Sequence, residues 1–151
     1  MAEQGGAELD WGVLGDAVGP RVRLLRNVLT SRIVAALAPF GLPSGALSIL
    51  ALIGANESCS QAALARQAGI GKPALVGILD ELERRGLATR AVSPEDRRRK
   101  ALSLTAEGKR MLEEMQHAAN AEEEAIRETL SVEERRQLLA FLDRAYAAVR
   151  E

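Results

Sequence analysis

Two short amphipathic segments joined by a very tight turn constrain this chain more than any other feature. The first begins after Ser60, whose hydroxyl can cap a helix, and ends at Gly69, a residue suited to the left-handed conformation that closes helices. The second ends at Gly86 and has four apolar residues at helical spacing: Leu75, Ile78, Leu79 and Leu82. Helices separated by so short a turn cross steeply. This is the helix-turn-helix arrangement, whose second helix can enter a DNA major groove.

A two-stranded hairpin with a basic tip is predicted directly after the second helix. Residues 87–92 and 100–104 are short alternating segments of strand length. The turn between them contains three consecutive arginines: Arg97, Arg98 and Arg99. A hairpin in this position is a wing, and arginines at its tip suit the narrow, electronegative minor groove. A solvated turn is the alternative, but the sign and position of the charge favour DNA.

The distribution of charge also favours a local DNA-facing surface. The chain has 151 residues and a net charge of −1. Residues 60–110 contain eleven Lys/Arg against six Asp/Glu, a net of +5, whereas residues 111–151 contain five against ten, a net of −5. Arg outnumbers Lys among these cations, and Arg is the type favoured for phosphate and base contacts.

Further helices are predicted on both sides of this module. They cover residues 17–38, an almost wholly apolar stretch at 43–55, a stretch from Thr105 to about 129, and the C-terminal stretch after a capping box at Ser131. Residues 56–59 form a connector that can add a third strand beside the wing. The outer helices carry apolar faces that the central module cannot cover, which favours a dimer over an intramolecular bundle.

Three stretches resemble a known family. They are Gly41-Leu42-Pro43, the segment ELERRGL, and PEDRRRKALSLTAEG. The last matches an Asp-x-Arg wing signature as Asp96 and Arg98, followed by Leu-Thr-x-x-Gly as Leu104, Thr105 and Gly108. Over roughly residues 20–150 the chain thus resembles the MarR family of winged-helix regulators. The resemblance implies an obligate homodimer that binds pseudo-palindromic DNA and is released by a small ligand or an oxidant.

We therefore predict a mainly α fold with a small β-hairpin wing, a winged helix-turn-helix with N- and C-terminal dimerisation helices. Residues 1–16 are expected to form a flexible arm and residues 17–151 a single domain. Within it, 43–105 is the predicted DNA-binding lobe, and 17–38 and 106–151 are the predicted dimerisation helices.

The predicted DNA contacts come from the second helix of the module and from the wing. Family members commonly carry hydroxyl residues and an Arg on this helix, where this chain has Pro73, Ala74, Val76 and Gly77. Readout should therefore rely on the wing, phosphate contacts and DNA shape. Asp96 is expected to orient Arg98. The predicted contact set is Lys72, Pro73, Val76, Gly77, Arg84, Arg90, Arg97, Arg98, Arg99 and Lys100.

An effector site is predicted near Arg23, Arg26 and Asn27, because many family members bind aromatic or other anionic effectors near the first helix. Two Arg side chains suit a carboxylate. The remaining members of the predicted site are Ser31, Ser48, His117 and Trp11. Ion pairs for the arginines and ordinary packing for Trp11 are the alternatives.

Catalysis has no support in the sequence. One histidine and one cysteine far apart do not form a nucleophile–base pair, no Cys/His cluster has metal-ligand spacing, and no cofactor motif is present. Cys59 precedes a helix N-terminus, so redox sensing is a hypothesis, but a small buried residue is the simpler interpretation. A single cysteine and the absence of a signal-peptide pattern predict a cytoplasmic protein. The predicted function is a homodimeric repressor; a protein-interaction module and an effector-independent DNA binder are the alternatives.

Overall fold

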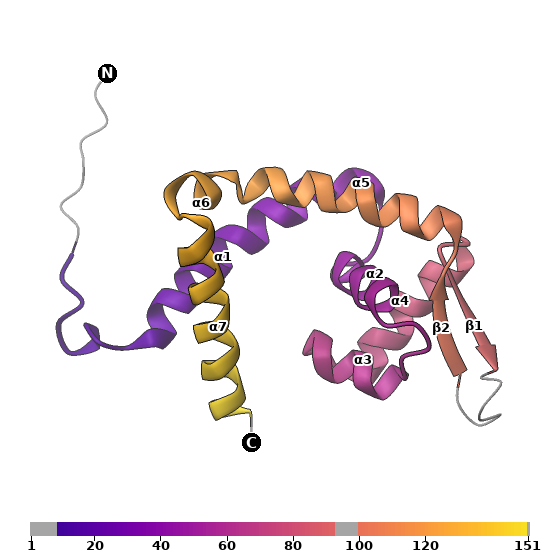
Figure 1. Cartoon of the computed structure of the whole chain (residues 1–151), viewed down its shortest axis with the longest axis horizontal. Coiled ribbons are helices and arrows are strands. Elements are labelled where there is room, and N and C mark those ends of the chain that lie inside the picture. Colours follow the sequence, from indigo (N-terminus) through magenta and orange to yellow (C-terminus); the bar gives the residue numbers. More distant parts are fainter. Residues whose placement is uncertain (1–8, 93–99, 151) are drawn as a thin grey trace.

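The computed structural model describes residues 9–92 and 100–150 and confirms a mainly helical fold with a two-stranded wing (Figure 1). The wing strands pair antiparallel, with Ala88 opposite Leu104 and Val92 opposite Lys100. The elements in chain order are η1 (Gly12–Leu14), α1 (Val18–Leu37), η2 (Ala38–Phe40), α2 (Ala46–Ala55), α3 (Gln61–Ala68), α4 (Lys72–Arg84), β1 (Ala88–Val92), β2 (Lys100–Leu104), α5 (Ala106–Glu122), α6 (Glu124–Thr129) and α7 (Val132–Val149).

The core lies where α2, α3, α4 and the wing meet. All four apolar residues predicted for the second helix of the module are buried in α4, so that its opposite face is left toward solvent. α2 contributes Ile49, Leu50 and Ile53, which are at most 1% exposed, and Met115 of α5 closes the core from the other side. This packing determines which face of α4 can meet a ligand.

Capping residues set the helix boundaries as the sequence predicts. Ser60 Oγ accepts the Ala63 amide at 3.2 Å, and Gly69 takes a φ of 66° at the end of α3. Thr105 Oγ1 accepts the Gly108 amide at 2.9 Å at the start of α5. Ser131 and Glu134 form the predicted capping box of α7.

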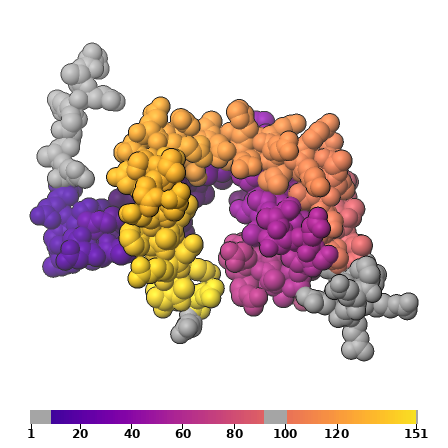
Figure 2. Space-filling view, viewed as in Figure 1, coloured from indigo at the N-terminus to yellow at the C-terminus, as the bar shows by residue number. Residues whose placement is uncertain are grey.

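α1 and α7 remain uncovered in the single chain. α5 packs along α1, and the chain then turns through α6 into α7 (Figure 1). Figure 2 shows an open hollow between α7 and the lobe formed by α2 to α4. Neither α1 nor α7 contains a buried residue. Their exposed large apolar side chains are Val18, Val22, Leu24, Leu25, Val28, Val34, Val132, Leu138, Leu139, Phe141, Leu142, Tyr146 and Val149.

Three details of the predicted elements are wrong. α2 begins at Ala46, because residues 43–45 form a turn in which Gly45 has a φ of 88°. The helix predicted from Thr105 to about 129 is divided at Glu123, where Arg127 donates to the Asn120 carbonyl and side chain at 2.8 and 2.9 Å. The connector makes one hydrogen bond to β2, from the Ser58 amide to the Leu102 carbonyl, so it adds no third strand to the described sheet.

Candidate DNA-binding surface and effector cleft

The outward face of α4 is the exposed surface at the centre of the helix-turn-helix. Lys72, Pro73 and Gly77 are exposed and Val76 is half-buried. A Cβ added at Gly77 would meet nothing within 4 Å, so this part of the helix offers a flat, open surface. Lys72 stands at the N-terminus of α4, where backbone amides and the helix dipole also favour anions. The face can approach a phosphate backbone closely.

Two predicted DNA contacts already bind carboxylates in the single chain. Arg84 forms a bidentate pair with Glu81 at 2.7 and 2.8 Å, and its side chain stays 68% exposed. Arg90 of β1 reaches back to α4, with Nη2 at 2.5 Å from Asp80 and Nε at 2.9 Å from Glu83. Its side chain is only 16% exposed, so Arg90 joins the wing to α4. A phosphate contact by Arg84 or Arg90 stays a prediction and would compete with these carboxylates.

Most of the other residues predicted to contact DNA from the wing are outside the residues that the structure describes. Asp96, Arg97, Arg98 and Arg99 fall within residues 93–99, outside the described residues. Lys100 is the first residue of β2 and pairs with Val92 in the register. The described strands therefore place Val92 and Lys100, the residues on either side of residues 93–99, opposite each other.

A cleft of about 720 Å³ lies between α1, α2 and α5. Ile33 contributes from α1, Leu47 and Ala51 from α2, and Leu104 and Leu112 complete a largely apolar floor. The polar lining residues are Ser48, Lys109, Glu113, Gln116, Asn120 and Glu123. Such a cleft, apolar inside with a few polar groups, suits a small organic ligand.

Of the seven residues predicted to bind an effector, Ser48 lines this cleft and the other six do not. Arg23 lies ten residues before Ile33 on α1, a distance of about 15 Å along a helix. Arg26 contacts Asn27 weakly at 3.5 Å, and Ser31 donates to the Val28 carbonyl at 2.9 Å.

Two further members of that set lie on other surfaces. His117 is exposed on α5. Trp11 packs against Arg21, whose guanidinium carbon is 5.1 Å from the ring centroid, so ordinary packing accounts for its position.

A signal for the cleft is present in the sequence, although the predicted effector residues do not include it. Polar residues recur at helical spacing along α5 and at its C-terminal cap, about 100° around the helix from the buried Met115: Lys109, Glu113, Gln116, Asn120 and Glu123. The same periodicity describes an ordinary solvated helix face. Only the crossing of α5 over α1 and α2 turns that face into the wall of a cleft.

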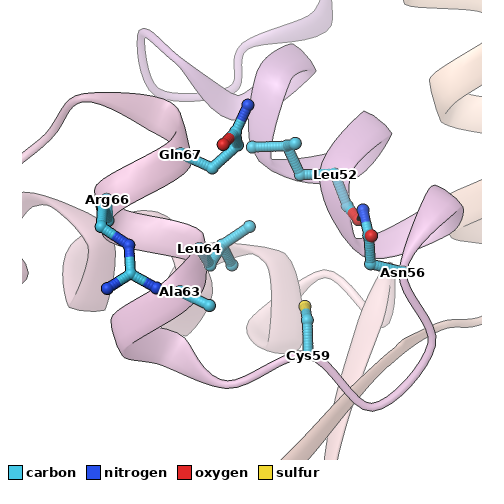
Figure 3. A pocket seen from close by; sticks show the side chains of 7 residues that line it. All are labelled: Leu52, Asn56, Cys59, Ala63, Leu64, Arg66 and Gln67. Carbon is cyan, nitrogen blue, oxygen red and sulfur yellow. Dashed lines mark hydrogen bonds between the residues drawn. The ribbon is translucent and has the colours of Figure 1, made fainter. Parts of the chain in front are cut away.

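Cys59 lies in a second, smaller pocket between α2 and α3. The pocket has a volume of about 300 Å³, and Figure 3 shows the Cys59 sulfur facing the space between Leu52 and Leu64. Burial raises the pKa of the Cys59 thiol, which lowers the fraction of reactive thiolate. The environment of Cys59 thus argues against redox sensing.

Two negative findings apply to residues 9–92 and 100–150. They contain no group of three or more His, Cys, Asp or Glu side chains placed to hold a metal ion. None of the helices in this part of the chain is long and apolar enough to cross a membrane.

Comparison with known proteins gives consistent matches. The model of the MarR family matches residues 40–99. A Thauera aromatica protein named for transcriptional regulation of the hcr operon is 33% identical over 106 residues, which are 70% of this chain and 64% of that relative's length.

Two solved structures resemble nearly the whole chain. The transcriptional repressor CouR bound to a 23-mer DNA duplex has a TM-score of 0.77 and 31% identity, covering 92% of this chain and 99% of its own. CouR from Rhodococcus jostii RHA1 bound to p-coumaroyl-CoA has a TM-score of 0.79 and 28% identity, covering 91% and 96%.

Proposed function

Because the chain belongs to the MarR family of non-enzymatic, DNA-binding transcription regulators, we propose that it is a homodimeric repressor of a pseudo-palindromic promoter site. A small aromatic or anionic effector releases it from DNA. The observation that carries this proposal is the likeness of 92% of the chain to a repressor bound to a DNA duplex.

The uncovered faces of α1 and α7 support the dimer. Leu139, Phe141 and Val149 of α7 are 62%, 58% and 79% exposed, and α1 adds a second exposed apolar stripe. Soluble proteins rarely leave contiguous apolar patches open unless a partner covers them. We propose that residues 17–38 and 106–151 associate with the same segments of a second copy, and that residues 43–105 form the DNA-binding lobe.

The two copies of α4 would then enter successive major grooves, with the wings in the flanking minor grooves. Lys72, Pro73, Val76 and Gly77 lie at the end of α4 that would meet base edges. Arg97, Arg98 and Arg99 would supply the minor-groove contacts, and Lys100 would contact a phosphate. Arg84 and Arg90 would contact phosphates after rearrangement of their present pairs.

The cleft between α1, α2 and α5 is the proposed effector site. Its apolar floor suits an aromatic ring or acyl chain. Lys109, which lines the cleft together with Glu113 and Glu123, is the side chain that suits a carboxylate or phosphate. The CouR structure with p-coumaroyl-CoA supports this class of ligand, since that molecule combines an aromatic acyl group with several phosphates. We retain Ser48 from the predicted set and add Lys109 and Gln116.

Binding to the DNA upstream of the protein's own gene tests the proposal. The assay compares two salt concentrations and includes random-sequence competitor. Specific binding that weakens steeply with salt is expected, because phosphate neutralisation dominates affinity. Binding no stronger than to random DNA would instead indicate a protein-interaction module or a non-specific DNA binder.

Replacing one wing arginine sharpens the test. Arg98→Ala should weaken specific binding by about 1–3 kcal/mol if the side chain reaches a base edge or the narrow groove. Arg136→Ala is the matched control, since Arg136 is 70% exposed on α7 and pairs only with Glu133 among the described residues. Equal affinities for the two folded variants would refute the assigned role of Arg98.

A further inference from the structure

Arg85, directly after α4, connects the end of this helix to a segment more than forty residues earlier. Its Nη1 donates to the Phe40 carbonyl at 3.0 Å and its Nη2 to the Gly41 carbonyl at 2.5 Å. Its Nε donates to Glu81 Oε1 at 2.6 Å. The side chain is 31% exposed, so one partly buried guanidinium holds α4 and residues 40–41 together.

The two carbonyls belong to the C-terminal end of a continuous helical unit. η2 continues α1, and Gly41 ends it with a φ of 62°. Carbonyl groups at a helix C-terminus lack intrahelical partners, and the helix dipole favours a cation there. Arg85 therefore caps the end of α1 and η2 from another element. Glu81 keeps the guanidinium in place, and its hydrogen bonds from Arg84 and Arg85 lower the pKa of its carboxyl to about 2.

The segment that Arg85 holds also borders the proposed effector site. Ala38, Leu42 and Pro43 line a cavity of about 190 Å³ together with Met115. Ile33 and Leu47 line both this cavity and the larger cleft between α1, α2 and α5. A ligand that shifts α1 or α2 in the cleft therefore acts on the segment whose carbonyls Arg85 binds.

We propose that Arg85 is a positioning residue that couples the α1–α2 connection, residues 38–45, to the orientation of α4 on DNA. The inference rests on the proposed function. α4 has 13 residues, a length of about 20 Å, and Arg85 lies at the end opposite Lys72. When the whole DNA-binding lobe tilts about the Arg85 end, the Lys72 end, which is proposed to meet base edges, moves most, while the contacts of one lobe with its own half-site are kept. The charge-assisted bonds of Arg85 make this end a fixed pivot.

Arg84 provides a matched control. It precedes Arg85, shares Glu81 and carries the same charge, but it makes no hydrogen bond to residues 38–45 in the described structure. Arg85→Ala removes the connection, and Arg85→Lys keeps the charge but cannot bind Glu81 and both carbonyls with planar geometry. Arg84→Ala removes a nearby charge without removing the connection.

The first measurement is the affinity of each full-length variant for operators whose half-site spacing is changed by one base pair. Arg84→Ala removes a proposed phosphate contact, so its affinity should fall by the same factor at every spacing while its discrimination between spacings stays as large as the parent's. Arg85→Ala should instead lose about fivefold or more of that discrimination. Binding to a single half-site should stay unchanged in Arg85→Ala, a result that general destabilisation would not produce. The spacing discrimination of Arg85→Lys should lie between that of the parent and that of Arg85→Ala. Unaltered spacing discrimination in Arg85→Ala would overturn the proposal.

A second measurement does not depend on DNA. Spin labels at Ala62→Cys, an exposed position on α3, in a Cys59→Ala background report the distance between the two lobes of a dimer. A broader distance distribution for Arg85→Ala than for Arg84→Ala supports the coupling. Equal distributions would overturn the coupling by Arg85, even if specific DNA binding is confirmed. Absence of specific DNA binding in the parent would separately refute the proposed function.

Discussion

Gly108→Ala should destabilise the protein because a methyl group at this position collides with backbone. A Cβ at Gly108 would lie 1.9 Å from the Leu87 carbonyl oxygen and 2.8 Å from its carbon, whereas real Cβ atoms are essentially never found under 3.0 Å from a neighbour. The obstacle cannot rotate away as a side chain would. The same Leu87 oxygen accepts the Thr105 amide at 3.1 Å, so the first turn of α5 is held against the start of the wing.

The expected loss of stability in Gly108→Ala can be estimated from the shift of α5 that the added methyl group requires. Relieving the overlap requires α5 to shift by about 1 Å or more from Leu87, and overpacking of this kind costs about 1–3 kcal/mol. Weakening the Thr105–Leu87 hydrogen bond adds about 0.5–1.5 kcal/mol. The higher helix propensity of Ala offsets about 1 kcal/mol. A net loss of about 2 kcal/mol in the free energy of unfolding is therefore expected.

Gly77→Ala is the control for this prediction. It places the same methyl group in the interior of α4, where nothing lies within 4 Å, and should stabilise by about 0.5–1 kcal/mol. Urea unfolding, followed by circular dichroism at one protein concentration, measures both variants, because the stability of a dimer depends on concentration. If Gly108→Ala is as stable as the parent, the close approach of α5 to Leu87 is wrong.

Two smaller predictions concern charges and caps. Ser131→Ala removes the capping box of α7 and should cost about 1 kcal/mol in thermal or urea unfolding; an unchanged midpoint would show that the cap adds nothing to global stability. The pKa of Glu81 is lowered to about 2, so its contribution to stability is complete above the ordinary value of 4.5 and declines as pH falls towards 2. Unfolding measured between these pH values should show a smaller decline for Glu81→Gln than for the parent, and identical pH profiles would contradict the prediction.

The helix-turn-helix and its caps could be predicted because their causes are local. The spacing of Leu75, Ile78, Leu79 and Leu82 determines which face of α4 is buried, and Ser60, Thr105 and Ser131 cap the helices that directly follow them. Hydrophobic periodicity and side-chain caps act over one or two turns, so they are visible in a single sequence.

The cleft between α1, α2 and α5, the division of the α5 region at Glu123 and the partners of Arg85 could not be predicted in this way. Each depends on packing between elements distant in the chain or on a hydrogen bond from a side chain to backbone several residues away, such as the bond that Arg127 donates to the Asn120 carbonyl. No Gly or Pro marks the break between α5 and α6. The cleft lined by Ser48 has the same origin, since the packing of α1 and α5 decides where a cleft opens, and the effector role of Arg23 stays a prediction.

The pairing of Arg84 and Arg90 with Glu81, Asp80 and Glu83 has a consequence for the ions around a DNA complex. An arginine that moves from a protein carboxylate to a DNA phosphate releases a condensed counterion from the DNA. The carboxylate that it leaves then binds a salt cation from solution, so the net release of ions is small. Each phosphate contact otherwise contributes about −0.9 to the slope of log affinity against log salt. The slope for this protein should therefore be shallower than its eleven basic residues at positions 60–110 suggest, and exchange of Asp80 or Glu83 for the neutral amide should make it steeper.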